Sequence, residues 1–334
     1  MSGNSNSTYV LSVVATYWVV SISMVYLNKM LLSNPDASIP APMFVTWYQC
    51  VLTCMICAFL GNRGESSRAS GQASLLNEFS VVKYDLKVGM SFLPLSLIFV
   101  GMVAFNNLCL QYVEVSFYNV ARSLSIVFNV VFTYTLLGKT TSALTCLTLG
   151  FVIIGFVVGI DGEVNFSMLG TSAGVMSSLF VSLNSIYTSK VLPKVDNDKS
   201  ALLFYNNYNA AFLFLPLIVL FETETIMENT SKLFSLFFWF AMSVTGVMGF
   251  AIGLVTVMQV KATSPLGHNI SGTAKAAAQS LLAFYIWGNP ATTKGVMGIF
   301  LVLGGSALYT YVQMQAPPPP KKEEETATPD VEKK

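Results

Sequence analysis

Long runs of apolar residues, separated by short polar segments, make up most of the chain. Each run has about the length of the roughly 20 residues that a helix needs to cross the core of a bilayer. The runs are continuously apolar and do not alternate, so they predict helices and not the strands of a barrel. The predicted spans are residues 10–32, 41–61, 88–111, 115–137, 142–160, 168–190, 200–221, 233–258, 264–287 and 294–315.

The composition indicates the same class of protein. Of the 334 residues, 53% are hydrophobic and only 10% are charged, whereas a soluble domain carries about 25% charged residues. The mean hydropathy is +0.61. A net charge of +1 argues against nucleic-acid binding, which needs a strong basic field. We therefore expect an all-α integral membrane protein with ten transmembrane helices.

The ten spans divide into two halves of five. An odd number of spans in each half makes the second half enter the membrane upside down, and such inverted repeats around a central cavity are typical of transporters. We expect the first repeat at 10–160, with a cytosolic loop at 62–87, and the second at 168–315. A weak echo between "QYVEVSFYNVARS" (111–123) and "QVKATSPLGHNISGT" (259–273) supports this division.

The distribution of charge predicts the orientation in the membrane. With both termini on one side, the segments on that side hold most of the lysines and arginines, and the loops on the other side hold Lys232 and Lys294. The positive-inside rule then places both termini in the cytosol. These are a short N-terminus, 1–9, and a proline-rich, charged tail, 316–334, which we expect to be disordered.

Three cations lie within predicted spans or at their margins: Lys29, Arg122 and Lys275. No acidic residue clearly within a span can pair with them. A lysine that faced lipid at mid-depth would cost at least ~2.5 kcal/mol, so Lys275 should face a polar cavity or a partner. In a helix its face also carries His268, Ser271, Gly272 and Gln279. Cations without an internal acid predict an anionic ligand, and a phosphate-bearing solute fits.

Polar side chains also gather on other spans. In "FYNNYN" (204–209), Asn206 and Asn207 offer hydrogen-bond donors and acceptors, and Tyr205 offers a flat ring, which together suit a nucleobase. Any single Ser, Thr or Asn could equally join neighbouring helices. The other candidates are Tyr17 and Asn28 on the first span and Asn119 on the fourth.

Other motifs point away from enzymatic chemistry. "GKT" (138–140) lacks the first glycine of a P-loop, and "DND" (196–198) reads as a solvated turn. The five cysteines suit packing better than metal binding. We expect no catalytic residues, metal or cofactor. The alternatives to a transporter are a membrane enzyme and a membrane adaptor that transports nothing. Two small-xxx-small pairs, Gly155 with Gly159 and Gly249 with Gly253, predict close helix packing.

Six segments together carry a resemblance to a known family: "FVTWYQC" (44–50), "FNNLCLQYV" (105–113), "FYNVARSL" (117–124), "SLNSIYTSKVLP" (182–193), "FYNN" (204–207) and "TSPLGHNISGTAKAAAQ" (263–279). They resemble nucleotide-sugar transporters of the drug/metabolite transporter superfamily, and the resemblance covers about residues 10–315. Within this family, intact FYNN is similar to the guanine contact of the GDP-mannose carriers, whereas Ser271–Lys275 departs from their GALNK segment and favours fucose as the sugar.

The resemblance implies an activity and a set of contacts. It implies alternating-access antiport of cytosolic GDP-fucose into the Golgi lumen against GMP, with GDP-mannose or another nucleotide sugar as the alternative substrate. Membrane lipids and, in a homodimer, a second copy of the chain are the other expected partners. The implied contacts are guanine with Tyr205, Asn206 and Asn207, phosphate and sugar with Ser271, Gly272, Thr273 and Lys275, and, more weakly, sugar with Tyr17.

Overall fold

In a computed structural model of the chain, the described residues are 2–33, 39–70, 79–138, 142–162, 166–262, 265–287 and 292–315. All regular elements within these ranges are helices, which confirms the all-α prediction. Short helices η2 (Leu192–Val195), α8 (Thr223–Glu228) and α9 (Thr230–Leu233) connect the longer ones. The long helices are α1 (Ser2–Ser33), α2 (Pro42–Ala69), α3 (Leu86–Tyr112), α4 (Val115–Leu137), α5 (Ala143–Gly162), α6 (Met168–Val191), α7 (Lys199–Phe221), α10 (Leu236–Ala262), α11 (Pro265–Trp287) and α12 (Thr293–Gln315).

Nine helices within the described ranges are long and apolar enough to cross a membrane. The long helix outside this group is α11, whose polar stretch "HNISGTAK" lowers its mean hydropathy. Large apolar side chains on the outer faces of the helices are exposed, for example Leu147 and Ile154 on α5. Such a surface suits the apolar interior of a membrane and not water.

Local capping explains where several helices begin and end. Asp85 accepts hydrogen bonds from two backbone N–H groups in the first turn of α3, and Asp198 does the same for α7. Asp196 and Asn197 have positive φ, so "DND" forms the expected turn, and its last residue, Asp198, also caps α7. Gly138 ends α4 with φ of 63°, a conformation that glycine adopts without strain.

Some boundaries differ from the predicted ones. Helix α2 continues to Ala69, eight residues beyond the predicted span 41–61, so the start of the expected loop 62–87 is helical. The segment between α7 and α10 forms two short helices instead of an open loop. The tail 316–334 and residues 71–78 of the loop lie outside the described residues. The spans were predicted from the length of apolar runs, so short polar helical segments outside them were not predicted.

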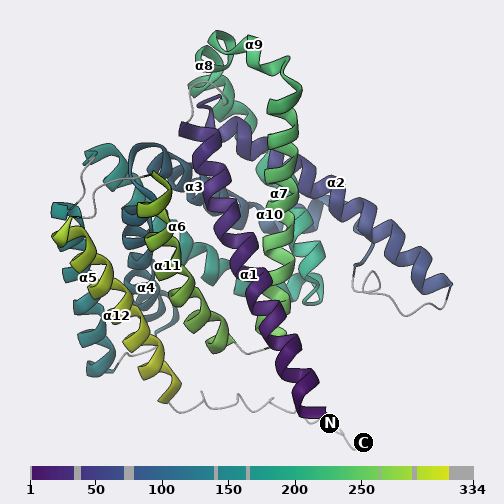
Figure 1. Cartoon of the computed structure of the whole chain (residues 1–334). Coiled ribbons are helices and arrows are strands. Elements are labelled where there is room, and N and C mark those ends of the chain that lie inside the picture. Colours follow the sequence, from purple (N-terminus) through teal and green to yellow (C-terminus); the bar gives the residue numbers. More distant parts are fainter. Residues whose placement is uncertain are drawn as a thin grey trace, which may run out of the picture.

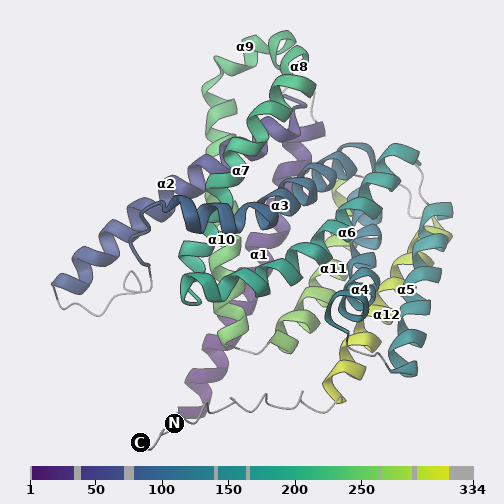
Figure 2. The same cartoon turned by 180° about the vertical axis from the view of Figure 1, so that it is seen from behind.

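The molecule has two ends, which we call the N-terminal face and the opposite face. Helix α1 begins and α12 ends at the N-terminal face, and α8 and α9 lie at the opposite face (Figure 1). Helices α4, α5, α11 and α12 gather on one side of α1, and α2 and α7 lie on the other (Figures 1 and 2). The most extended contacts join α5 to α12, α3 to α6, α2 to α7, α4 to α6, and α1 to α10.

Glycines allow α5 and α12 to approach very closely. A Cβ added at Gly155 would lie 2.7 Å from the backbone nitrogen of Val302, and one added at Gly298 would lie 2.7 Å from the Cα of Gly159. The predicted close packing is thus confirmed for this pair. It is wrong for α10, where a Cβ at Gly253 would meet its first neighbour at 3.9 Å, an ordinary contact.

Candidate ligand-binding site

A cavity of about 440 Å³ lies between α1, α4, α6, α11 and α12. Its volume falls within the roughly 300–1,000 Å³ of small-molecule sites. None of the described residues that line it is acidic. The lining is formed by Tyr17, Val25, Tyr118, Asn119, Arg122, Ser123, Ser125, Ile126, Asn129, Val181, Ser182, Ser185, Gly272, Lys275, Ala276, Gln279, Leu303, Ser306, Tyr309 and Thr310.

Lys275 stands where α11 faces α1. Its Nζ donates to the Ser21 hydroxyl at 2.7 Å and lies 5.6 Å from the centre of the Tyr17 ring. An ammonium has three donors, and a neutral hydroxyl and an aromatic face leave its charge uncompensated. The side chain is half-buried, so an ion that enters the cavity can reach it.

Arg122 brings a second cation to the same cavity from α4. It donates to the Tyr118 hydroxyl at 2.8 Å, and its guanidinium lies 5.9 Å from the centre of that ring. The side chain is exposed within the cavity. A planar guanidinium can bind two oxygens of one phosphate. Two cations and no acid in the described lining therefore make a site for an anion.

Hydrogen bonds between helices close the cavity toward the opposite face. Gln279 donates to Asn119 Oδ1 at 3.2 Å, and Asn119 donates to the Ser280 hydroxyl at 3.1 Å, so α4 is joined to α11. The Tyr26 hydroxyl of α1 donates to the Gln279 carbonyl at 2.6 Å. From this level the lining continues along α4 to Asn129, toward the N-terminal face.

The third cation, Lys29, has a different environment. Its Nζ donates to the carbonyl of Leu110 and, at 2.7 Å, to that of Val113. These carbonyls lie at the end of α3, where backbone acceptors lack partners within the helix and a cation is favourable. Lys29 is not among the residues that line the cavity, and it joins α1 to α3.

The structure does not bring the FYNN segment to this cavity. The Tyr205 hydroxyl donates to the Lys83 carbonyl at 3.0 Å, Asn206 accepts from Ser96 at 3.1 Å, and Asn207 donates to the Leu203 carbonyl at 2.8 Å. All four FYNN side chains are buried. Because α7 packs along α2 and α3, this segment faces those helices and not the cations.

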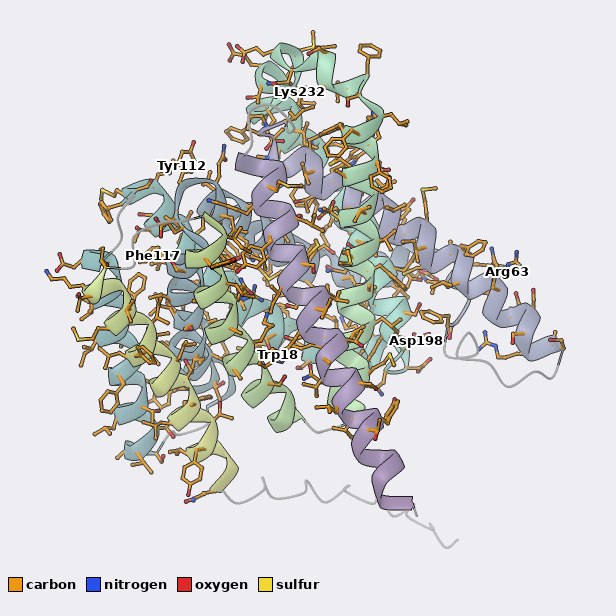
Figure 3. The ribbon with its side chains drawn as sticks, in the orientation of Figure 1. Trp18, Arg63, Tyr112, Phe117, Asp198 and Lys232 are labelled. Atoms are coloured by element: carbon orange, nitrogen blue, oxygen red, sulfur yellow. The ribbon has the colours of Figure 1, made fainter. Side chains whose placement is uncertain are left out.

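The remaining candidates divide between the cavity and helix contacts. Gly272 lines the cavity, with open space where a side chain would be. Ser271 accepts from Trp18 and from Gln259, each at 2.8 Å, and Trp18 lies on α1 beside α11 (Figure 3). Asn28 accepts from Gln49 at 3.2 Å. The side chains of His268 and Thr273 lie outside the described part of the structure.

The prediction missed the hydroxyl-bearing residues of α12 that line the cavity. Helix α12 contributes three side chains that no motif had singled out, Ser306, Tyr309 and Thr310, and α6 contributes Ser182 and Ser185. The sequence did contain a signal: Tyr309 and Thr310 follow Ser306 by three and four residues, which places their side chains on one face of an apolar helix. It is weak, because Ser306 and Thr310 also donate to carbonyls of their own helix.

Comparison with known proteins identifies the family. Residues 8–310 match the Triose-phosphate Transporter family. The chain belongs to this family. It lies within the drug/metabolite transporter superfamily, so the predicted relationship is confirmed.

Individual relatives cover nearly the whole chain. The chain is 50% identical to "GDP-fucose transporter 1" of Mus musculus over 90% of this chain and 82% of the relative. It is 45% identical to "GDP-fucose transporter 1" of Nematostella vectensis over 92% and 90%. It is 40% identical to "GDP-fucose transporter, Golgi" of Drosophila melanogaster over 95% and 93%. A solved crystal structure with 17% identity superposes with a TM-score of 0.52, covering 89% of this chain and 98% of its own, and supports the fold alone.

Proposed function

We propose that this protein is a transporter that moves GDP-fucose across a membrane in exchange for GMP. The observation that carries this proposal is a cavity with two cations, Lys275 and Arg122, and no acidic residue in its described lining. The relatives named above as GDP-fucose transporters, at 40–50% identity, support this sugar nucleotide as the substrate. GDP-mannose or another nucleotide sugar is the alternative.

The architecture that we propose has ten membrane-crossing helices in two inverted repeats, α1–α5 and α6–α12. In this arrangement the counterparts are α1 and α6, α2 and α7, α3 and α10, α4 and α11, and α5 and α12. Replacing each helix of a contacting pair by its counterpart gives, for most pairs, another pair that is also in contact. The α3–α6 contact then corresponds to α1–α10, α3–α7 to α2–α10, and α4–α5 to α11–α12. Each of the pairs α2–α7, α5–α12 and α4–α11 corresponds to itself. Helix α11 would be the tenth span, with its polar face turned to the cavity.

We place the phosphates of the substrate at Lys275 and Arg122, with Tyr17 and Gly272 beside the sugar. Asn119 and Gln279 form the closed end of the site. His268 and Thr273 remain candidates from the family resemblance. These assignments rest on the position of each residue in the cavity or on the family motif. Variants of Lys275 and Arg122, given in the Discussion, test the two cations.

If Tyr205, Asn206 and Asn207 bind guanine, the protein must change conformation. In the present conformation Asn206 is bonded to Ser96 and Asn207 to its own helix. Binding of a guanine edge would have to replace these hydrogen bonds, so α7 or α3 would have to shift. Asn206→Ala should then weaken GDP and GMP equally, because both carry the same base.

Exchange has a physical reason in this cavity. Closing around two uncompensated cations takes charge out of water, which is unfavourable unless a counter-charge is present. GDP-fucose and GMP each bring a phosphate that supplies it. An empty transporter would therefore return slowly, and the two fluxes would be coupled.

The location that we propose is the Golgi membrane, with both termini in the cytosol. The name of the Drosophila melanogaster relative supports the compartment, and the excess of lysine and arginine on one side supports the orientation. The cavity lining continues toward the N-terminal face, so this conformation would be the one that faces the cytosol.

Uptake into liposomes that contain the purified protein tests the proposal. With GMP inside, labelled GDP-fucose should enter several times faster than into GMP-free liposomes. Unlabelled GDP-mannose, UDP-sugars and CMP-sugars should compete poorly. Equal uptake without GMP would overturn the exchange, and stronger competition by a uridine ligand would overturn the assignment to guanine.

A further inference from the structure

The ends of α1 and α6 carry the same pattern of side chains. "SISMVYLNKML" (21–31) and "SLNSIYTSKVL" (182–192) share serine, tyrosine, lysine and leucine at equal spacing. Ser21 thus corresponds to Ser182, and Lys29 to Lys190. In the proposed inverted repeats α1 and α6 are counterparts, so the same side chains occur at opposite faces of the molecule.

In the first copy of the pattern the polar side chains join helices. Ser21 accepts from Lys275, and the Tyr26 hydroxyl donates to the Gln279 carbonyl. Lys29 donates to the last carbonyls of α3. Together these bonds hold α1 against α11 and α3, and those of Tyr26 and Lys29 lie on the side where the cavity is closed.

Within the described residues, the corresponding side chains of the second copy lack such partners. The Ser182 hydroxyl lines the cavity, is 2% exposed as a residue, and has no hydrogen-bond partner in the described part of the chain. Lys190 is exposed, and its ammonium lies 5.6 Å from the Tyr187 ring of its own helix. A buried hydroxyl without a partner requires an explanation, and a second conformation that supplies the partner is one.

The counterpart of the α3 end is the end of α10. Aligning Gln111 with Gln259 matches the acceptors Leu110 and Val113 to Met258 and Lys261. Lys261 is among the last four residues of α10, which ends at Ala262, so its carbonyl also lacks a partner within the helix. In the described residues α1 and α3 are in contact, whereas α6 and α10 make at most a marginal contact.

We infer that Lys190 is a gating residue that donates to the last carbonyls of α10, among them that of Lys261, when the cavity closes toward the N-terminal face. Lys29 would release α3 in the same transition. Each lysine would stabilise one of the two conformations, through the attraction of a cation to a helix C-terminus. The inference rests on the proposed function, because it assumes inverted repeats and alternating access.

A cysteine reporter in the cavity tests this without any substrate. Asn129→Cys lies at the end of the cavity toward the N-terminal face, and Cys146→Ser removes the exposed native cysteine. We would measure the rate at which an impermeant maleimide labels the full-length protein in detergent, subtracting a sample without the reporter. Labelling requires the conformation seen here, so its rate follows the population of that conformation.

Lys29→Gln should slow labelling about two- to fivefold, because it removes a cation at a helix C-terminus from this conformation. Adding Lys190→Gln should restore most of the rate, since the other conformation then loses its own lysine. Adding Lys194→Gln, a nearby exposed lysine, should not. If Lys29→Gln does not yield folded protein, Tyr26→Phe weakens the same closed side and takes its place.

Two results would overturn the inference: an unchanged rate in the variant that weakens the closed side, or no restoration by Lys190→Gln. Failure of the proposed function would look different. In that case the unmodified protein would not exchange GDP-fucose for GMP in liposomes, while the labelling rates would still decide the role of Lys190.

Discussion

Lys275 and Ser21 are joined by a hydrogen bond of 2.7 Å that links α11 to α1 within the cavity. The ammonium retains further donors, and the serine is neutral. An entering phosphate can therefore bind Lys275 without displacing a carboxylate. This relationship explains how a lysine can be retained in a membrane helix and still be available to a ligand.

Lys275→Ala should reduce the exchange rate at least about tenfold, because a hydrogen bond to a charged group contributes about 1.5–3 kcal/mol. The protein should remain folded, which size-exclusion chromatography can check. Lys294→Ala is the matched control: its ion pair with Asp161 is exposed and should contribute little. Wild-type exchange by Lys275→Ala would refute the phosphate contact.

Arg122 should depend on its shape as well as its charge. Arg122→Lys retains the positive charge but cannot bind two phosphate oxygens in a plane. We expect it to bind GMP more weakly than the wild type and more tightly than Arg122→Gln. Isothermal titration with GMP measures this order, and equal affinities for all three proteins would contradict it.

The close contact of α5 and α12 should tolerate no side chain. Gly155→Leu would place atoms against the backbone of Val302, and overpacking of this kind costs about 1–3 kcal/mol. We expect a lower Tm for the detergent-solubilised protein. Gly253→Ala on α10 is the control, since its Cβ would make ordinary contacts. A similar loss in both variants would contradict the assignment.

Glu222 gives a prediction for pH. Its carboxylate joins the end of α7 to the start of α2 by accepting from the backbone N–H groups of Met43 and Phe44, both at 2.8 Å. Burial raises the pKa of this carboxyl above the ordinary 4.5, although the two N–H groups act in the opposite direction. The folded protein therefore holds the proton more tightly than the unfolded chain does.

The stabilisation from this proton is fully present below pH 4.5 and is lost as the pH rises through the raised pKa. Over that window the Tm of the wild type should fall relative to that of Glu222→Gln, which does not titrate. Thermal unfolding of both proteins at a series of pH values measures the difference. A difference that grows in the opposite direction would show a lowered pKa.

The sequence predicted the helices well because membrane helices must satisfy their backbone internally and remain apolar along their whole length. It predicted Lys275 and Arg122 because an unpaired cation in such a helix is conspicuous. Lys29 gave the same signal, yet it binds the end of α3. Its role depends on which helix end lies nearby, and a single helix pattern does not contain that information.

The other differences also arise from tertiary contacts. FYNN is polar enough for a site, but the packing of α7 turns it toward α3 in this conformation. Ser306 and Thr310 line the cavity, but each hydroxyl also donates to a carbonyl of α12. In the sequence they therefore look like serines and threonines of any membrane helix. Which polar face meets a cavity is decided by the neighbours of a helix.

Helix α2 has 28 residues and therefore a length of about 42 Å at 1.5 Å per residue. A bilayer core is only about 30 Å thick, so an upright α2 would extend roughly two turns beyond it. Those turns carry Arg63, which lies far from the bundle (Figure 3), and Arg68. With Glu65 between them, these two arginines would place a net charge of +1 among the lipid headgroups at this end of α2.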